Sequence, residues 1–243
     1  MRFLAAVALA VCLAGVSYAD PIAPGVEMVT DGGFETGTAG NSIIPPGVAF
    51  PAYNAMTGPF GVWIDVNQWK YVAGGPSGSG LYAGHVTGNT NNTNLLFQGI
   101  NTSMGLGGTK LAFEMDYRFD GGHDNRRVFV LGLTTENVSR FAPFWPSGNA
   151  FLPPGDILLD LNKNDLPLTN GGSHITRSIM VTNPNAYKSI VVAIIFNSGS
   201  VAAGQTATRG VDNVSLKVVP EPGALLLFAA AGAAMLVRRR RRT

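Results

Sequence analysis

Polar and apolar side chains alternate along short stretches of this chain, and that two-residue period is the strongest constraint on what it can fold into. The clearest example is Leu111–Phe119, in which Phe113 and Met115 fall on one face and Glu114 falls on the other. Because a β-strand points successive side chains to opposite faces, this stretch is predicted to be a strand with one buried and one solvated face.

Strands are predicted along most of the chain, and no stretch between its two ends shows the 3.6-residue period of a capped amphipathic helix. Ser189–Phe196 is apolar on both faces and predicts a central strand. Further strands are predicted at Val26–Thr30, Val62–Val66, Trp69–Val72, Leu81–Val86, Asn94–Ile100, Val128–Leu133, Asp156–Leu161, Ile175–Val181 and Val211–Val218. So many short strands without an internal repeat predict an all-β fold, an antiparallel β-sandwich of the jelly-roll type.

The N-terminus has the layout of a signal peptide. Arg2 precedes the apolar run Phe3–Val16, and small residues follow at the positions that signal peptidase reads. Cleavage is therefore predicted between Ala19 and Asp20. The alternatives are an uncleaved N-terminal anchor and a lipoprotein modified at Cys12.

The C-terminus combines a short motif, an apolar run and a basic cluster. The motif is Val219, Pro220, Glu221 and Pro222, the apolar run is Gly223–Val237, and the cluster is Arg238, Arg239, Arg240, Arg241 and Arg242. A helix over the apolar run would be about 22 Å long, and flanking arginines can snorkel to bridge a hydrocarbon core of about 30 Å. Arginine is costly at the bilayer centre and is attracted to anionic cytoplasmic lipids, so the predicted topology has the arginines inside and the body outside.

This order of segments resembles the PEP-CTERM family of bacterial surface proteins. The matching residues are Pro220–Pro222, the apolar run Gly223–Val237 and the cluster Arg238–Arg242. The resemblance implies a Gram-negative bacterium that makes extracellular polysaccharide. It also implies that exosortase, an integral-membrane transpeptidase-like enzyme, processes the chain near the Pro-Glu-Pro motif and removes the tail. The alternative is a plain single-span anchor with a proline-rich linker beside the membrane.

The two ends also account for the net charge of +2 on the whole chain. Without Arg2, the five C-terminal arginines and Glu221, 11 basic and 14 acidic residues remain, so the body is near −3 and nucleic-acid binding is not expected. The only cysteine, Cys12, lies in the signal segment, which leaves the body without disulfides or thiol nucleophiles. We expect a signal helix over 1–19, one β-sandwich over 20–218, and a sorting signal with a transmembrane helix over 219–243.

A second resemblance concerns the body. Val29–Glu35 and Val211–Leu216 resemble the first and last strands of galactose-binding-like jelly rolls, a fold shared by many carbohydrate-binding modules. The resemblance implies that these strands lie close together and that Glu35 and Asp212 help to bind a structural calcium ion. Carboxylates are the hard oxygen ligands that calcium prefers. The alternative is that Asp212 caps a turn and Glu35 is a solvated strand end.

Other metal sites have less support. Asp160–Asp165 begins like an EF-hand loop, but the positions that need Gly and a bidentate Glu hold other residues, so a hairpin turn is predicted. His85, His123 and His174 are widely separated and form no His-x-x-x-His pair, which disfavours a zinc site.

Catalytic motifs are also missing. There is no Gly-x-Ser-x-Gly nucleophile motif, and the sequence singles out no opposed carboxylate pair for glycoside hydrolysis. Glu114 and Asp116 share a strand face and are expected to pair with Arg118 or with neighbouring strands. A protein without enzymatic activity is therefore predicted.

Aromatic residues raise the possibility of sugar binding, because flat rings stack on the apolar faces of pyranoses. The candidates are Trp69, Tyr71 and Trp145, with nearby amide and carboxylate groups for the hydroxyls. The alternative is that these rings fill the core, which is the prediction for Trp63 in its apolar context.

The sequence thus predicts an exported surface or extracellular-matrix protein. Its partners would be signal peptidase, exosortase and, as a transient anchor, the inner membrane. The body is expected to be a structural or adhesive module. The alternatives are a carbohydrate-binding module for extracellular polysaccharide and, last, a glycan-active enzyme.

Overall fold

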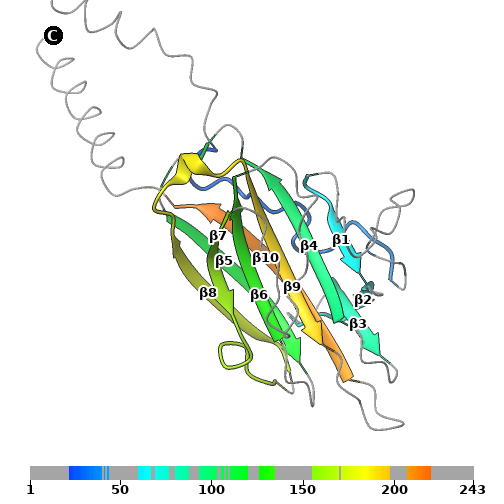
Figure 1. Cartoon of the computed structure of the whole chain (residues 1–243). Coiled ribbons are helices and arrows are strands. Elements are labelled where there is room, and N and C mark those ends of the chain that lie inside the picture. Colours follow the sequence, from blue (N-terminus) through cyan, green and yellow to red (C-terminus); the bar gives the residue numbers. More distant parts are fainter. Residues whose placement is uncertain are drawn as a thin grey trace, which may run out of the picture.

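The computed structural model describes residues 22–39, 41, 43, 60–66, 69–76, 80–87, 93–102, 105–106, 108, 110–119, 126–134, 155–169, 171–197 and 207–219. These residues form two five-stranded antiparallel sheets that pack face to face, as Figure 1 shows. The two expected terminal helices lie outside them. Within the described ranges, no helix has the length and apolar character needed to cross a bilayer.

Each sheet has a defined strand order. Sheet I contains, from edge to edge, β1 (Trp63–Val66), β4 (Thr93–Asn101), β9 (Ser189–Asn197), β6 (Arg126–Leu133) and β7 (Gly155–Leu161). Sheet II contains β2 (Lys70–Ala73), β3 (Leu81–Thr87), β10 (Ala207–Val218), β5 (Lys110–Phe119) and β8 (Ser173–Met180). A single 3₁₀ turn, η2 (Pro184–Ala186), joins β8 to β9 within the described chain.

The strand order confirms the jelly roll. Strands β3 to β10 pair as nested hairpins, with β6 against β7 innermost, then β5 against β8, β4 against β9, and β3 against β10. This long hairpin rolls up so that β10 also pairs with β5 and β9 also pairs with β6, which closes the two sheets. Strands β1 and β2 extend the sheets beside β4 and β3.

All but one of the predicted strands are present, most of them within one or two residues of the expected bounds. The exception is Val26–Thr30, whose prediction as a strand is wrong, since only Glu27 forms an isolated bridge, to Lys217. The chain turns immediately afterwards, with positive φ at Asp31 and Phe34, so no regular ladder can develop.

The connection after β7 also differs from expectation. Asn162–Asp165 is a tight turn, in which the amide of Asp165 donates to the carbonyl of Asn162 over 3.0 Å and the amide of Asn164 donates to the Asn162 side chain over 2.8 Å. A turn was predicted, but the hairpin was wrong, because β7 and β8 belong to different sheets. Asp160 instead pairs with Arg127 of the neighbouring strand.

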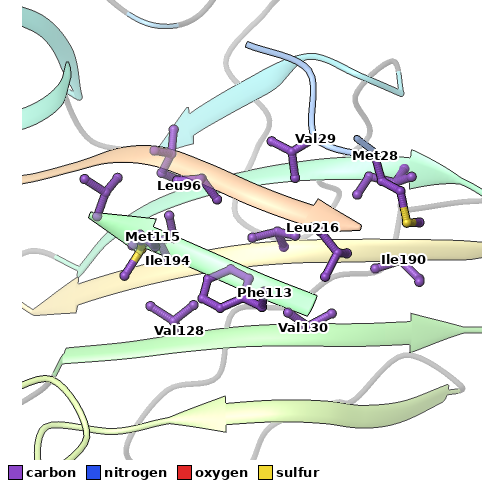
Figure 2. Close-up of a cluster of buried hydrophobic side chains, with 14 of the residues drawn as sticks. Met28, Val29, Leu96, Phe113, Met115, Val128, Val130, Ile190, Ile194 and Leu216 are labelled. Atoms are coloured by element: carbon purple, nitrogen blue, oxygen red, sulfur yellow. The ribbon is translucent and has the colours of Figure 1, made fainter. Parts of the chain in front are cut away.

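The main core lies between the two sheets. Figure 2 shows Phe113 and Met115 of β5 meeting Val128 and Val130 of β6, and Leu216 of β10 close by. Phe113 and Met115 are fully buried, as their alternation with polar residues predicts. Complete burial of such side chains is worth roughly 1.5–3 kcal/mol each, so this layer is the main source of stability.

A second apolar cluster lies on the outer face of sheet I. It is almost completely buried and comprises Leu95, Phe97, Phe129, Leu131, Leu133, Val191, Ala193 and Ile195, with Phe60 packed against it. The guanidinium of Arg127 lies 4.7 Å from the centre of the Phe129 ring, at the edge of the cluster. Sheet I is thus apolar on both faces, which explains why the sequence of β9 is a continuous hydrophobic run.

The N-terminal segment closes the sandwich along β10. The amide of Met28 donates to the carbonyl of Leu216 over 2.9 Å, and the amide of Val214 donates to the carbonyl of Gly32 over 2.9 Å. On the other side, the buried Gln98 side chain of β4 exchanges two 2.8 Å hydrogen bonds with the backbone of Thr30. This segment therefore ties both sheets together.

Replacing Gly32 tests this closure. A Cβ at Gly32 would lie 1.8 Å from the carbonyl oxygen of Val214, so Gly32→Ala must displace the backbone. We expect a loss of about 2 kcal/mol or more in the free energy of unfolding, measured by urea denaturation. The control is Gly171→Ala, where a Cβ meets nothing within 4 Å and the change should stay within about 0.5 kcal/mol. Equal stability of the two variants would contradict the closure.

Candidate functional site

The first candidate region is the end of β10, where the predicted sorting motif begins. Val218 is completely buried, and its carbonyl accepts a 2.7 Å hydrogen bond from the amide of Gly25. The amide of Val219 donates to the carbonyl of Lys110 over 2.8 Å. The first residue of the motif is therefore fixed to the fold, with no spacer after the last strand. Pro220, Glu221, Pro222 and Arg238–Arg242, like Ala19 and Asp20 at the other terminus, lie outside the described residues.

The surface around this point mixes apolar and basic groups. Met180 is 67% exposed and lies opposite Lys110 in the ladder between β8 and β5, and Val26, next to Gly25, is 49% exposed. Lys110 and Lys188 are exposed. We call this end of the sandwich, with Val26, Lys110, Met180, Lys188 and Val219, the C-terminal pole.

A buried tyrosine, Tyr187, lies just inside the pole. The hydroxyl of Tyr187 donates to Asp156 over 2.5 Å, and the ring packs against Gly132. Burial, and then the hydrogen bond to the Asp156 carboxylate with its negative charge, raise the pKa of Tyr187 to about 12. Tyr187 therefore stays neutral at physiological pH and acts as a structural tie between β7 and the segment before β9.

The second candidate region surrounds the connection from β2 to β3, where Glu35 and Asp212 lie. Glu35 accepts a 3.1 Å hydrogen bond from the amide of Leu81. Asp212 is 2% exposed and accepts from the amide of Asn213 over 2.8 Å, at a bulge in β10. The structure thus brings both residues beside the same connection, although they are far apart in sequence.

Two glycines make room for these carboxylates. A Cβ at Gly75 would lie 2.9 Å from Oδ2 of Asp212, and a Cβ at Gly80 would lie 2.0 Å from Oε1 of Glu35. The backbone of the connection closes on itself, since the amide of Gly74 donates to the carbonyl of Gly80 over 3.0 Å. A larger residue at position 80 would displace the Glu35 carboxylate.

The donor set at this connection fits calcium only in part. Two carboxylates supply hard oxygens, but calcium takes six to eight ligands, so carbonyl groups or water would have to complete the shell. In the part of the chain that the structure describes, no three His, Cys, Asp or Glu side chains gather where they could hold a metal ion. The calcium site stays a prediction for Glu35 and Asp212.

Sequence reasoning missed Asp31, which organises the turn before Glu35. Its carboxylate accepts from the amide of Glu35 over 3.1 Å and from the hydroxyl of Thr36, and its carbonyl accepts from the indole N–H of Trp63 over 3.1 Å. An Asp followed by two glycines is a recognisable turn signal and could have identified it.

The three aromatic candidates for sugar binding differ in how far the structure buries them. Trp69 is completely buried, so its prediction as a stacking residue is wrong. No face of its indole is open to a ligand. Tyr71 is half-buried against Gly37, and this burial raises the pKa of its hydroxyl. Trp145 lies outside the described residues, and Trp63 is buried in the core as predicted. None of the aromatic side chains whose burial is described is exposed.

A polar network on the outer face of sheet II was only partly anticipated. Nδ1 of His174 lies 2.6 Å from Asp116, and Nε2 lies 3.0 Å from the hydroxyl of Thr176. The side-chain amide of Asn213 donates to the second oxygen of Asp116 over 2.7 Å. Asp116 pairs with a neighbouring strand, which was one of the two expectations for it. The cross-strand register, which sequence alone does not give, brings these residues together.

Comparison with protein families identifies the tail. The family model described as the PEP-CTERM protein-sorting motif matches residues 218–242, so the match begins at the last residue of β10. This part of the chain is a PEP-CTERM sorting motif, and it implies export and exosortase-mediated sorting to the cell surface. None of the curated proteins matches the chain in sequence.

Solved structures resemble the body only in general shape. A cyclase from Fischerella sp. TAU has a TM-score of 0.48 at 13% identity, over 81% of this chain and 99% of that one. TmCBM61, solved in complex with β-1,4-galactotriose, gives 0.44 at 10% identity, over 79% and 97%. The K3 cleaved adhesin domain of Lys-gingipain from Porphyromonas gingivalis gives 0.40 at 13% identity, over 81% and 99%.

Chelation tests the calcium prediction. If Glu35 and Asp212 hold calcium at about 100 times its Kd, its removal costs about 2.7 kcal/mol, and the melting temperature should fall by about 5 °C or more. Glu35→Gln should abolish this response, whereas Glu114→Gln, on the outer face of β5, should retain it. A melting temperature unchanged by chelator in the unmodified protein would rule out the ion.

Proposed function

We propose that this chain is an exported surface or extracellular-matrix protein that is sorted through its PEP-CTERM signal and whose β-sandwich acts as a structural or adhesive module. The observation that carries the proposal is the sorting motif at 218–242, which starts where the folded body ends. In this proposal the motif directs processing, and the jelly roll is the part that remains at the surface.

Each terminal segment of the chain has its own role in the proposed route. The signal peptide directs export and is removed by signal peptidase between Ala19 and Asp20. The apolar run Gly223–Val237 then holds the chain in the inner membrane, and Arg238–Arg242 stop its transfer because their charges resist crossing the bilayer. Exosortase acts near Pro220–Pro222 and releases the body to the cell envelope.

The proposed role of the body follows from its surface. A sugar-binding platform needs exposed aromatic rings, but the described aromatic side chains are buried or half-buried, and Trp69 has no accessible face. This favours a structural or adhesive module over a carbohydrate-binding one. Binding to extracellular polysaccharide stays a prediction that rests on Tyr71 and Trp145.

Mass spectrometry of the surface form tests the sorting proposal. In a strain with exosortase, the intact mass should lack Arg238–Arg242, because cleavage near the motif removes the tail. In the same strain without exosortase, or with Glu221→Ala, we expect the tail to be retained. A surface form that still carries the complete tail in the exosortase-containing strain would refute the proposal.

Affinity electrophoresis tests the role of the body. In a gel containing extracellular polysaccharide from the producing strain, a structural module should migrate as it does in a gel without the polymer. Retardation that is lost in Tyr71→Ala or Trp145→Ala would instead support the carbohydrate-binding alternative. Trp63→Phe serves as a control for a buried aromatic residue.

A further inference from the structure

The distance between the folded body and the apolar run is short enough to restrict where the body can lie. The amide of Val219 is hydrogen-bonded to Lys110, and only positions 220–222 separate it from Gly223. Four residue steps span at most about 14 Å when fully extended, at roughly 3.3–3.6 Å per residue. While the apolar run is in the membrane, the C-terminal pole cannot be farther than this from the hydrocarbon boundary.

The headgroup layer occupies a large part of that distance. A bilayer is about 40–45 Å thick including its headgroups, and its hydrocarbon core is about 30 Å, so each headgroup layer is roughly 5–8 Å deep. The gap left between the lipid surface and Val219 is therefore less than about 10 Å even with an extended linker. The side chains that project from the pole can cross a gap of this size.

The surface of the pole suits contact with lipid. Met180 at 67% and Val26 at 49% exposure are two of the four large hydrophobic residues that are exposed in the described structure. The exposed Lys110 lies beside Met180 in the ladder, and the exposed Lys188 precedes β9. Of the nearby carboxylates, Glu27 lies 3.5 Å from the ammonium group of Lys217, and Asp156 accepts a hydrogen bond from Tyr187. Apolar side chains among lysines are typical of surfaces that lie on anionic membranes.

We infer that the C-terminal pole lies against the outer surface of the inner membrane before processing, with Val26 and Met180 in the headgroup layer and Lys110 and Lys188 facing anionic lipid phosphates. This inference rests on the proposed membrane-held intermediate and specifies how the body is oriented in it. The polar network of Asp116 and His174 would then lie away from the bilayer surface, because Asp116 is six residues along β5 from Lys110.

Single-cysteine labelling tests the orientation, because the body has no cysteine of its own. In a Cys12→Ser background, a polarity-sensitive fluorophore is attached to Val26→Cys or Met180→Cys. The tail-bearing chain, from a host without exosortase, is reconstituted in phosphatidylethanolamine–phosphatidylglycerol liposomes. The matched control is Leu168→Cys, which is also 49% exposed but lies near the end of β5 remote from Lys110, since Thr169 is hydrogen-bonded to Phe119.

Flotation of the liposomes first reports whether the tail is inserted. In floated protein, we expect the fluorophore emission at positions 26 and 180 to shift to the blue. A nitroxide attached to the lipid headgroups should quench it at both positions, and neither effect should occur at position 168. Lys110→Glu should weaken the quenching at position 180. Protein that floats with equal responses at 180 and 168 would overturn the orientation and leave the membrane intermediate intact. Protein that does not float would overturn the membrane intermediate, and the orientation with it.

Discussion

The hydrogen bonds along both edges of β10 are the interaction on which the rest of the structure depends. One edge pairs with β5 along the length of the strand, while the other pairs first with β3 and then with the irregular segment that contains Met28 and Gly32. Because the first and last parts of the chain meet here, the roll closes only when the chain is complete to Val218. This closure places Glu35 and Asp212 beside the connection from β2 to β3. It also fixes the position of Val219.

Local periodicity was sufficient to predict most strands and the fold class. In β5 the buried and solvated residues alternate as the sequence does, and the apolar β9 lies at the centre of sheet I. Val26–Thr30 has the composition of a strand, but its partner edge is shared with β3 and its continuation must turn at Asp31, so the ladder is reduced to one bridge. Such competition for a strand edge is a tertiary effect, and the β-propensity of the residues cannot predict it.

The candidate sites were harder to predict, because they depend on the register between strands and on which side chains the sandwich buries. Trp69 sits among polar residues in the sequence, yet the sandwich covers it completely. His174 meets Asp116 only because β8 and β5 are aligned in one particular register. The sorting motif is different, since its chemistry lies in a contiguous stretch and needs no fold to be recognised, which is why residues 218–242 could be identified directly.

The direct continuation of β10 into the tail also has a mechanical consequence. Any pull between the body and whatever holds its C-terminus acts along the axis of a central strand. The hydrogen bonds on both edges of β10 are perpendicular to that axis and are loaded in parallel, so they must fail together instead of opening one after another. This geometry resists shear along β10, and it follows from the direct continuation of the strand into Val219, whose amide is still hydrogen-bonded to the fold.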